Sequence, residues 1–145
     1  DILSHERIAD MLVINTTKNV LHQVAQHCKE QLDFNFLTTM CGMHYSERDT
    51  LGLVMHLQSM RKGHRIRLKA EVPLKEPVFP TFTDLWDTAN WMEREAWDFF
   101  GIQFTGHPNL KRILNMEDFP AVPLRTDYPL EDPTREDKDD SMFGR

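Results

Sequence analysis

Cysteine is scarce in this chain of 145 residues, with Cys28 and Cys41 as the only two. They lie far apart and form no Cys-x-x-Cys motif. An iron–sulfur cluster generally needs four protein ligands, so the chain cannot hold one alone. A zinc site made from both cysteines and two histidines stays open, although no histidine pair has ligand spacing near either. We expect two buried, reduced thiols in a cytoplasmic protein.

Long apolar runs are also absent, because no stretch approaches the roughly 18 residues of a membrane-spanning helix. The N-terminus lacks the basic-then-apolar pattern of a secretory signal. We therefore expect a soluble chain that reaches a membrane only through a partner. Since the chain starts at Asp1 rather than Met, loss of the initiator or an omitted N-terminal extension stays open.

A basic surplus is missing as well, since the formal net charge is −6. This disfavours a general nucleic-acid or anionic-membrane binder. One local strip is basic: Arg61, Lys62, Arg65, Arg67 and Lys69. Aromatic residues do not interleave with it, so an acidic partner surface or plain solvent explains it better than a base-stacking platform. No P-loop, GxSxG, HExxH or dinucleotide fingerprint occurs.

What is present is a globular composition, with 40% apolar and 28% charged residues, and a length typical of one domain. Apolar clustering predicts strands over residues 8–16, 34–45 and 51–60, the second of them central in the sheet. An amphipathic stripe predicts a helix over residues 19–32. Strict alternation predicts a half-buried strand over residues 65–72.

The order of these elements predicts an α+β domain. We expect a mostly antiparallel sheet of about four strands with helices on one side, followed by an extended, proline-containing C-terminal strap. A short helix capped by Thr83 should run to Asp87. The domain should span residues 1–105, and the strap and an acidic tail residues 106–145. The tail after residue 130 has six acids and three bases and too few apolar residues to fold alone.

A second helix, over residues 91–100, is the most informative segment. Asn90 is a suitable N-cap, Glu93 stands at the capping-box position, and Gly101 can end the helix in a left-handed turn. Arg94 and Asp98 are four residues apart, so a local ion pair between them is possible.

Beyond this helix, His107 and Pro108 predict a turn. Leu110, Ile113 and Leu114 would share one face of a short helical turn. Two prolines in residues 123–130 argue against a helix or a central strand there, so an extended segment along a surface is the natural geometry.

Charged side chains gather on and after this helix, which raises the question of acid–base chemistry. Proton transfer needs groups that converge on a pocket. Here the acids stand beside their own counter-ions, so neutralised pairs at a packing junction are the better interpretation. The groups concerned are Glu93, Glu95, Asp98 and His107, with Arg94 and Arg112 as counter-ions.

The same segment resembles a known family. The motif reads Glu93-Arg94-Glu95-x-x-Asp98-Phe99-Phe100-Gly101-Ile102, then Gly106-His107-Pro108, Arg112-Ile113-Leu114 and Pro123-Leu124-Arg125-x-Asp127-Tyr128-Pro129-Leu130, with upstream matches at Phe34-Asn35-Phe36-Leu37 and Asp84-Leu85-Trp86-x-x-Ala89-Asn90-Trp91. This pattern is similar to the 30-kDa subunit family of respiratory complex I, whose bacterial members are the C subunits of NADH-quinone oxidoreductase. The chain departs from it at Asn109, Thr126 and Ala121-Val122.

The resemblance implies a non-catalytic subunit in the peripheral arm of a proton-translocating NADH:quinone oxidoreductase. It implies no cofactor in this chain, with FMN, iron–sulfur clusters and quinone in partner subunits. The implied partners are the D subunit, which forms the quinone site, the B subunit, which carries the terminal cluster, and the I subunit. The implied location of the chain is the cytoplasmic face of the bacterial inner membrane, where it would be bound peripherally. The implied interface residues are Glu93, Arg94, Glu95, Asp98, Phe99, Phe100, His107, Pro108, Arg112, Arg125, Asp127 and Tyr128.

Two other hypotheses stay open. The same domain occurs in membrane-bound hydrogenases and in ferredoxin- or F420-linked complexes. A free-standing hydrolase that uses the carboxylate cluster is a weaker alternative.

Overall fold

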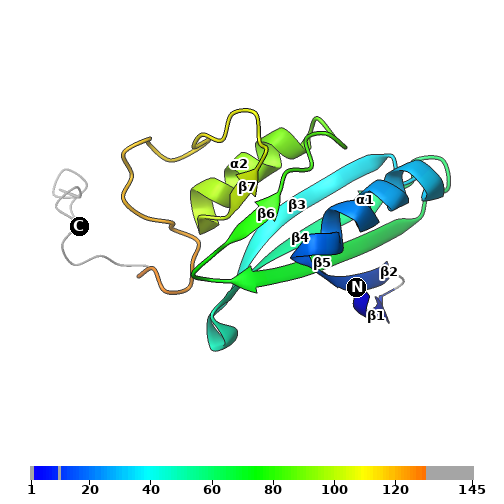
Figure 1. The fold of residues 1–145 in the computed structure, drawn as a ribbon, viewed down its shortest axis with the longest axis horizontal. Coiled ribbons are helices and arrows are strands. Elements are labelled where there is room, and N and C mark those ends of the chain that lie inside the picture. The colour runs from blue at the N-terminus through cyan, green and yellow to red at the C-terminus, as the bar shows by residue number, and fades with distance from the viewer. Residues whose placement is uncertain (1, 10, 130–145) are drawn as a thin grey trace, which may run out of the picture.

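The computed structural model describes residues 2–9 and 11–129, which form a five-stranded sheet with two helices and a smaller two-stranded sheet (Figure 1). The elements in chain order are β1 (Ile2–Ile8), β2 (Met11–Thr17), α1 (Lys18–Leu32), β3 (Phe36–Tyr45), a 3-10 turn (Ser46–Arg48), β4 (Thr50–Gln58), β5 (Arg65–Pro73), β6 (Val78–Pro80), α2 (Ala89–Phe100) and β7 (Gln103–Thr105).

The predicted α+β class is confirmed, and the main sheet has one strand more than expected. Its strand order is β1-β2-β5-β4-β3. Three of its four pairings are antiparallel, and β2 pairs with β5 in parallel. The extra strand, β1, is exposed along its whole length, so it carries little of the alternation that predicts a strand. The prediction that residues 34–45 form a central strand was wrong, because β3 lies at the edge.

Both helices lie on the same side of the main sheet, as predicted. The core under α1 contains Leu21 and Ala25 from the helix and Leu68 and Met55 from the strands. The alternation predicted for residues 65–72 is confirmed, since every second residue of β5 from Ile66 to Val72 is buried. The small parallel sheet of β6 and β7 lies beside α2 and between the two halves of the helical layer (Figure 1).

The C-terminal part of α1 ends as its sequence allows. Asp33 follows the helix with a left-handed backbone (φ 67°), and its N–H donates to the carbonyl of Cys28. Cys28 itself is buried against the sheet, as predicted. The prediction that Cys41 is buried was wrong: it is exposed on the opposite face of the edge strand β3. The two thiols therefore cannot share a zinc ion.

The start of α2 corrects two predictions. Residues 83–85 form a turn rather than a helix, in which Leu85 N–H and Trp86 N–H both donate to the carbonyl of Phe82. The helix begins at Ala89, so Asn90 lies inside it and cannot be its N-cap. The end at Gly101 is confirmed, because Gly101 has φ 76° and its N–H donates to the carbonyl of Trp97.

The segment after β7 contains neither helix nor strand in its described part, residues 106–129. It bends through turns instead of running extended: Arg125 N–H donates to the carbonyl of Val122, and Tyr128 N–H to that of Arg125. The acidic tail lies outside the described residues. Within the described ranges, neither helix is long and apolar enough to cross a membrane.

Candidate interface around α2

A close approach between α2 and β3 fixes the position of the helix. Gly42 of β3 lies beneath the ring of Phe100, and a Cβ there would stand 2.6 Å from Phe100 Cδ2 and 3.1 Å from Ile102 Cδ1. Ala96 and Ile102 are buried in the same core. Glycine in the strand thus brings the end of α2 onto the edge of the sheet.

The carboxylate of Asp98 in α2 binds the segment that follows β7. Its side chain is fully buried, and its Oδ2 accepts the backbone N–H groups of Ile113 (3.1 Å), Leu114 (2.9 Å) and Asn115 (3.0 Å). Its Oδ1 accepts Nδ2 of Asn115 (3.0 Å) and the guanidinium of Arg112 (2.7 Å). These donors explain why no helical turn forms over residues 110–114: the carboxylate takes the N–H groups.

The environment of Asp98 favours its charged form. Burial on its own would raise the pKa of this carboxyl. The N–H groups of Asn115 and Leu114, the Asn115 amide and the Arg112 guanidinium outweigh burial and hold the pKa well below its usual range. Asp98 is therefore a fixed anion at neutral pH.

Arg112 is the counter-ion of Asp98, and Arg94 is not, so the predicted Arg94–Asp98 pair does not form. The Arg112 guanidinium also donates to the carbonyl of Phe119 at 2.8 Å. It lies 5.6 Å from the ring centroid of Trp97 and 5.9 Å from that of Phe119, in cation–π range. Arg112 thus joins α2 to the loop that follows.

Arg94 holds the same loop from one helical turn earlier. Its Nε donates to the carbonyl of Lys111 at 3.1 Å and its Nη2 to the carbonyl of Arg112 at 3.0 Å. Its guanidinium also stacks 5.1 Å from the ring of Trp91. The two arginines therefore bind backbone carbonyls that no helix or strand satisfies.

Glu93 forms a second buried site on the opposite flank of the helix. It does not complete a capping box, because its Oε1 accepts Phe82 N–H at 2.6 Å and its Oε2 accepts the Thr81 hydroxyl at 2.7 Å. Burial raises the pKa of Glu93 to about 7, against the lowering effect of the Phe82 and Thr81 hydrogen bonds. The fully buried imidazole of His107 lies 4.0 Å from Oε2.

His107 has a defined tautomer. Its Nδ1 accepts the backbone N–H of Asn109 at 3.0 Å, so this nitrogen carries no proton. Its Nε2 therefore carries the proton and donates it to the carbonyl of Asn90 at 3.2 Å. His107 thus ties the turn after β7 to the first turn of α2.

The rest of the segment returns to the sheet. The N–H of Thr126 donates to Nδ1 of His44 at the end of β3, at 3.0 Å. Arg125 pairs with Asp127, and this hydrogen bond lowers the pKa of the Asp127 carboxyl. Tyr128 is half-buried.

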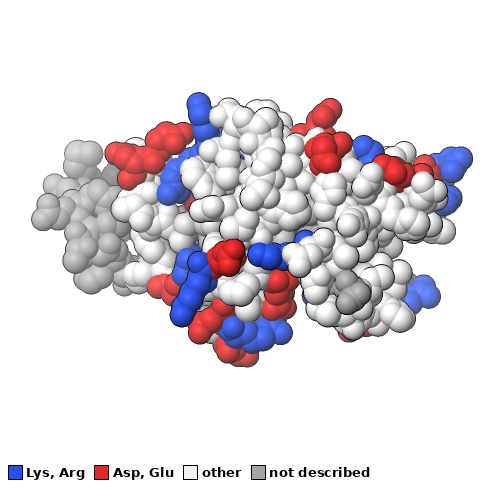
Figure 2. Space-filling model, viewed as in Figure 1, with Lys and Arg blue, Asp and Glu red and all other residues white. Residues whose placement is uncertain are grey.

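Large apolar side chains stand exposed on this scaffold. The exposed fraction is 60% for Trp91, 72% for Leu114, 70% for Met116 and 55% for Leu124. On the face seen in Figure 2, acidic and basic side chains lie intermixed at the edges and across the lower middle, and a broad area above the middle carries neither. Apolar side chains held out by a charged scaffold are typical of a protein–protein contact.

The structure brings most of the predicted residues together and separates their roles. Asp98, Arg112 and Arg94 form one cluster, and Glu93 with His107 forms the other. The predicted interface residues Glu95 and Pro108 are exposed, and Phe99 and Phe100 are half-buried. Sequence reasoning missed Asn115, Phe119 and Thr81, which contact these charges through loop geometry that no periodicity reveals.

The arrangement does not suit acid–base chemistry. Both buried carboxylates, Asp98 and Glu93, have no exposed surface, and donors of the chain itself occupy their oxygens. Among residues 2–9 and 11–129, no group of three histidines, cysteines or carboxylates could hold a metal ion. The sequence prediction of neutralised pairs at a packing junction agrees with the geometry of the Asp98–Arg112 cluster.

The fold and these clusters define a class: small α+β proteins in which buried charges on one helix fasten an otherwise irregular C-terminal segment. The sequence profile described as "Respiratory-chain NADH dehydrogenase, 30 Kd subunit" matches residues 14–134. The chain belongs to this family.

Curated relatives support the assignment. The chain is 43% identical to the NADH-quinone oxidoreductase C subunit, form 2, of Rhizobium meliloti (strain 1021) over 114 residues, 74% of this chain and 62% of that protein. It is 40% identical over 126 residues to the NADH-quinone oxidoreductase C subunit of Citrifermentans bemidjiense, 86% of this chain and 78% of that protein. The chain therefore spans less than two thirds of the first of these relatives.

Solved structures have the same fold. A trypsin-resistant fragment (1-134) of Nqo5 superposes with a TM-score of 0.68 at 32% identity, over 74% of this chain and 89% of the fragment. A chain of the membrane-bound sulfane sulfur reductase, an archaeal respiratory membrane complex, has a TM-score of 0.78 at 22% identity, over 88% of this chain and 77% of that chain. The latter similarity shows the fold alone.

Proposed function

We propose that this chain is a non-catalytic structural subunit of the peripheral arm of a proton-translocating NADH:quinone oxidoreductase. The observation that carries the proposal is the scaffold around Asp98, which holds exposed apolar side chains such as Trp91 and Leu114 in fixed positions. A pre-ordered apolar patch with a charged surround binds a partner at low entropic cost.

The partners we propose are the D subunit with the quinone site, the B subunit with the terminal cluster, and the I subunit. Family membership supports this assignment, and the exposed side chains of α2 and residues 106–129 would make the contacts. FMN, iron–sulfur clusters and quinone would lie in the partners. The chain would sit at the cytoplasmic face of the bacterial inner membrane and be bound there through its partners.

We also propose that the chain divides functionally after β7, which ends at Thr105. Residues 1–105 would form the folded body, and residues 106–145 the strap and tail that engage neighbours. The hydrogen bonds of Asp98 and Arg94 to residues 111–115 support this division, since they fasten the first part of the strap to the body.

One other function has a specific observation in its favour. The fold similarity to a chain of an archaeal respiratory membrane complex suits an equivalent subunit of a hydrogenase-type or ferredoxin- or F420-linked complex. The same scaffold would serve either assembly. The electron donor of the purified complex distinguishes the two.

The test is assembly in a bacterium whose own gene is replaced by a full-length gene carrying Arg94→Ala or Asp98→Ala. Both variants should lower the amount of assembled complex on native gels and leave quinone reduction per assembled complex unchanged. Lys75→Ala, at an exposed position in the turn between β5 and β6, is the control. Normal assembly with slowed quinone reduction would contradict the proposal.

A further inference from the structure

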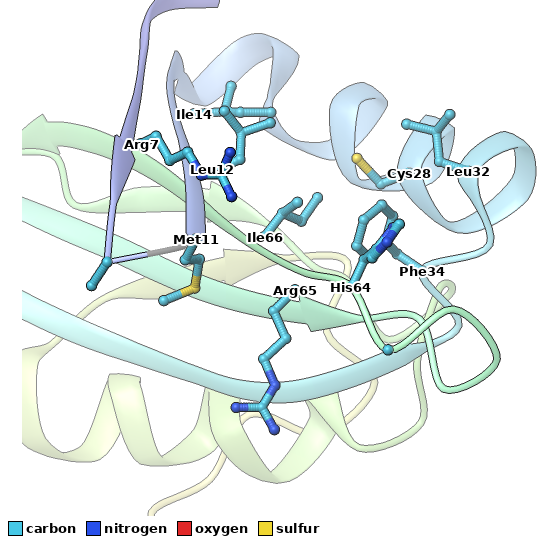
Figure 3. A pocket seen from close by; sticks show the side chains of 12 residues that line it. Arg7, Met11, Leu12, Ile14, Cys28, Leu32, Phe34, His64, Arg65 and Ile66 are labelled. Carbon is cyan, nitrogen blue, oxygen red and sulfur yellow. The ribbon is translucent and has the colours of Figure 1, made fainter.

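The face of the main sheet opposite the helices carries a cationic row. Lys69, Arg67 and Arg65 alternate with the buried residues of β5, so their side chains point away from α1. Figure 3 shows Arg65 directed away from the apolar groove that α1 forms with β2 and β5. This local positive charge stands out in a chain of net charge −6.

Buried apolar side chains lie next to the cationic row on the same face of the sheet. Val13 and Val54 are 0% and 5% exposed, although they lie outside the core beneath the helices. By strand register Val13 pairs with Arg67 and Val54 with Lys69. Arg67 and Lys69 are half-buried beside these valines, as expected where aliphatic stems of cations lie on apolar surface.

His56 orients one member of the row. Arg67 Nε donates to His56 Nε2 at 2.6 Å, so this imidazole nitrogen carries no proton. Burial and then the charges of Arg67, Arg65 and Lys69 lower the pKa of His56. A neutral His56 adds no charge of its own to the row. Only Nε of Arg67 is used in this hydrogen bond, so the other guanidinium N–H groups do not bind His56.

A groove of about 680 Å³ opens at the Lys69 end of this row. Its cations are Lys18, Arg48 and Lys69, and its carboxylate is Glu71. Glu71 already forms an ion pair with Arg48 at 3.1 Å and accepts a hydrogen bond from the Thr50 hydroxyl at 2.9 Å.

An aromatic wall closes one side of the groove. The ring of Tyr45 packs close to Gly52, where a Cβ would stand 2.7 Å from Tyr45 Cε2. Arg48 stacks over this ring at 4.4 Å from its centroid. Leu3 of β1 also lines the groove and is 65% exposed. The groove thus offers apolar walls and a cationic floor.

The spacing between the three cations of β5 matches that of alternate side chains in an extended peptide. Residues two apart on a strand stand about 7 Å apart, and the same holds for alternate side chains of an extended peptide. Carboxylates at alternate positions of such a peptide would therefore meet Lys69, Arg67 and Arg65 one by one. Acids on this face by register are Glu6 and Glu71, and Glu95 of α2 acts on Cys41 electrostatically from the β3 edge.

We propose that this face binds an extended acidic segment of a partner protein, with carboxylates at alternate positions along β5 and an apolar side chain between Tyr45 and Leu3. The surface is built from other residues than the Asp98 cluster and faces away from the core beneath the helices. Either proposal can fail without the other.

The first test measures binding of a synthetic, fluorescently labelled peptide with three glutamates separated by serines to the full chain by anisotropy. Lys69→Glu and, as a second variant, Lys18→Glu should weaken binding at least tenfold. Lys75→Glu, which changes the net charge equally at an exposed turn residue that does not line the groove, should leave it unchanged. The same peptide with glutamines should not bind.

Several results would overturn the proposal. Equal weakening by Lys69→Glu and Lys75→Glu would show attraction without a site. Tighter binding of inorganic tripolyphosphate than of the peptide would show a phosphate preference. A tenfold gain in peptide affinity for a chain that ends at Pro129 would identify the acidic tail of this chain as the occupant.

The second test uses the assembled complex. Cys41 is exposed on this face and pairs in register with Val54, the neighbour of Lys69. Maleimide should label Cys41 in the isolated chain and be blocked from it in the complex, while buried Cys28 stays unlabelled in both. A carbodiimide should join the Lys69 amine to a carboxylate of another subunit. Equal labelling of Cys41 in both states would contradict the proposal.

Discussion

The pKa values of two buried carboxyl groups on one helix shift in opposite directions, because the two groups accept different numbers of hydrogen bonds. Asp98 accepts three backbone N–H groups, an amide and a guanidinium, which stabilise its charge. Glu93 accepts one backbone N–H and one hydroxyl, which do not offset its burial. Asp98 is a structural anion, whereas Glu93, with its pKa raised to about 7, gains and loses its proton near neutral pH.

The raised pKa of Glu93 predicts that stability falls as the pH rises. Between its ordinary 4.5 and about 7, the folded protein holds a proton that the unfolded chain releases. Full ionisation should therefore cost roughly 3 kcal/mol of unfolding free energy. Glu93→Gln keeps an oxygen that can accept the Phe82 N–H and cannot ionise, so it should remove this slope and stabilise the protein at pH 8.

Urea unfolding of the wild type and Glu93→Gln between pH 5 and pH 8 checks this prediction. Glu95→Gln, at an exposed position of the same helix, should keep the wild-type slope. All other groups near this site are common to the three proteins, so the difference between wild type and Glu93→Gln isolates Glu93. Parallel pH profiles for wild type and Glu93→Gln would contradict it.

Asp98→Asn should destabilise the chain by about 3–5 kcal/mol at pH 7, because Arg112 loses its buried counter-ion. Because the pKa of Asp98 is lowered in the folded protein, the stabilisation by its charge is fully present above the ordinary carboxyl pKa of about 3.9. This stabilisation is lost as the pH falls toward the lower pKa of the folded state. The difference in unfolding free energy between wild type and variant should therefore shrink on acidification. Asp118→Asn, at an exposed position, should have little effect at any pH.

At the scale of elements, the contact of α2 with β3 depends on a missing side chain. The ring of Phe100 occupies the space that a Cβ of Gly42 would need. The helix end at Gly101 and the start of β7 follow directly, so a shift of Phe100 moves the whole α2–β7 corner. Close packing in protein interiors makes such a shift costly.

Gly42→Ala should therefore lower the unfolding free energy by about 1–3 kcal/mol through overpacking. Thr38→Ala, at an exposed position of the same strand, should change it by less than about 0.5 kcal/mol. Thermal and urea unfolding of both variants measure the effect. If Gly42→Ala were as stable as wild type, the close approach of Phe100 would be wrong.

At the scale of the whole molecule, the sheet separates two candidate surfaces. The helical side carries the exposed apolar residues of α2 and its loop, and the other side carries the cationic row of β5. A protein that must touch several neighbours needs such separate faces, since each partner requires its own patch.

Trp91→Ala should distinguish partner contact from fold stability. Trp91 is 60% exposed, and its stacking with Arg94 contributes about 0.5–1 kcal/mol. The isolated variant should thus unfold almost as the wild type does, while the assembled complex becomes less abundant in cells that express it. Unchanged assembly, measured on native gels beside Lys75→Ala, would exclude Trp91 from the interface.

Prediction from the sequence succeeded where a pattern is local. The stripe of α1, the alternation of β5 and the left-handed end at Gly101 each depend on neighbours within a few residues. The motif of α2 likewise pointed to the charged cluster at Asp98. The capping role of Asn90 and the ion pair of Arg94 were wrong, because both assumed partners within the helix.

The sequence by itself thus determined the α+β class, the two helices and the family, since these follow from periodicity and from an ordered motif. Only the tertiary structure decided which strand lies at the edge and which arginine neutralises Asp98. It also decided that β5 presents its cations opposite the helices. The physical reason is that hydrogen bonds and burial are settled by groups that meet in space, and a buried charge takes the best donors within reach wherever they lie along the chain.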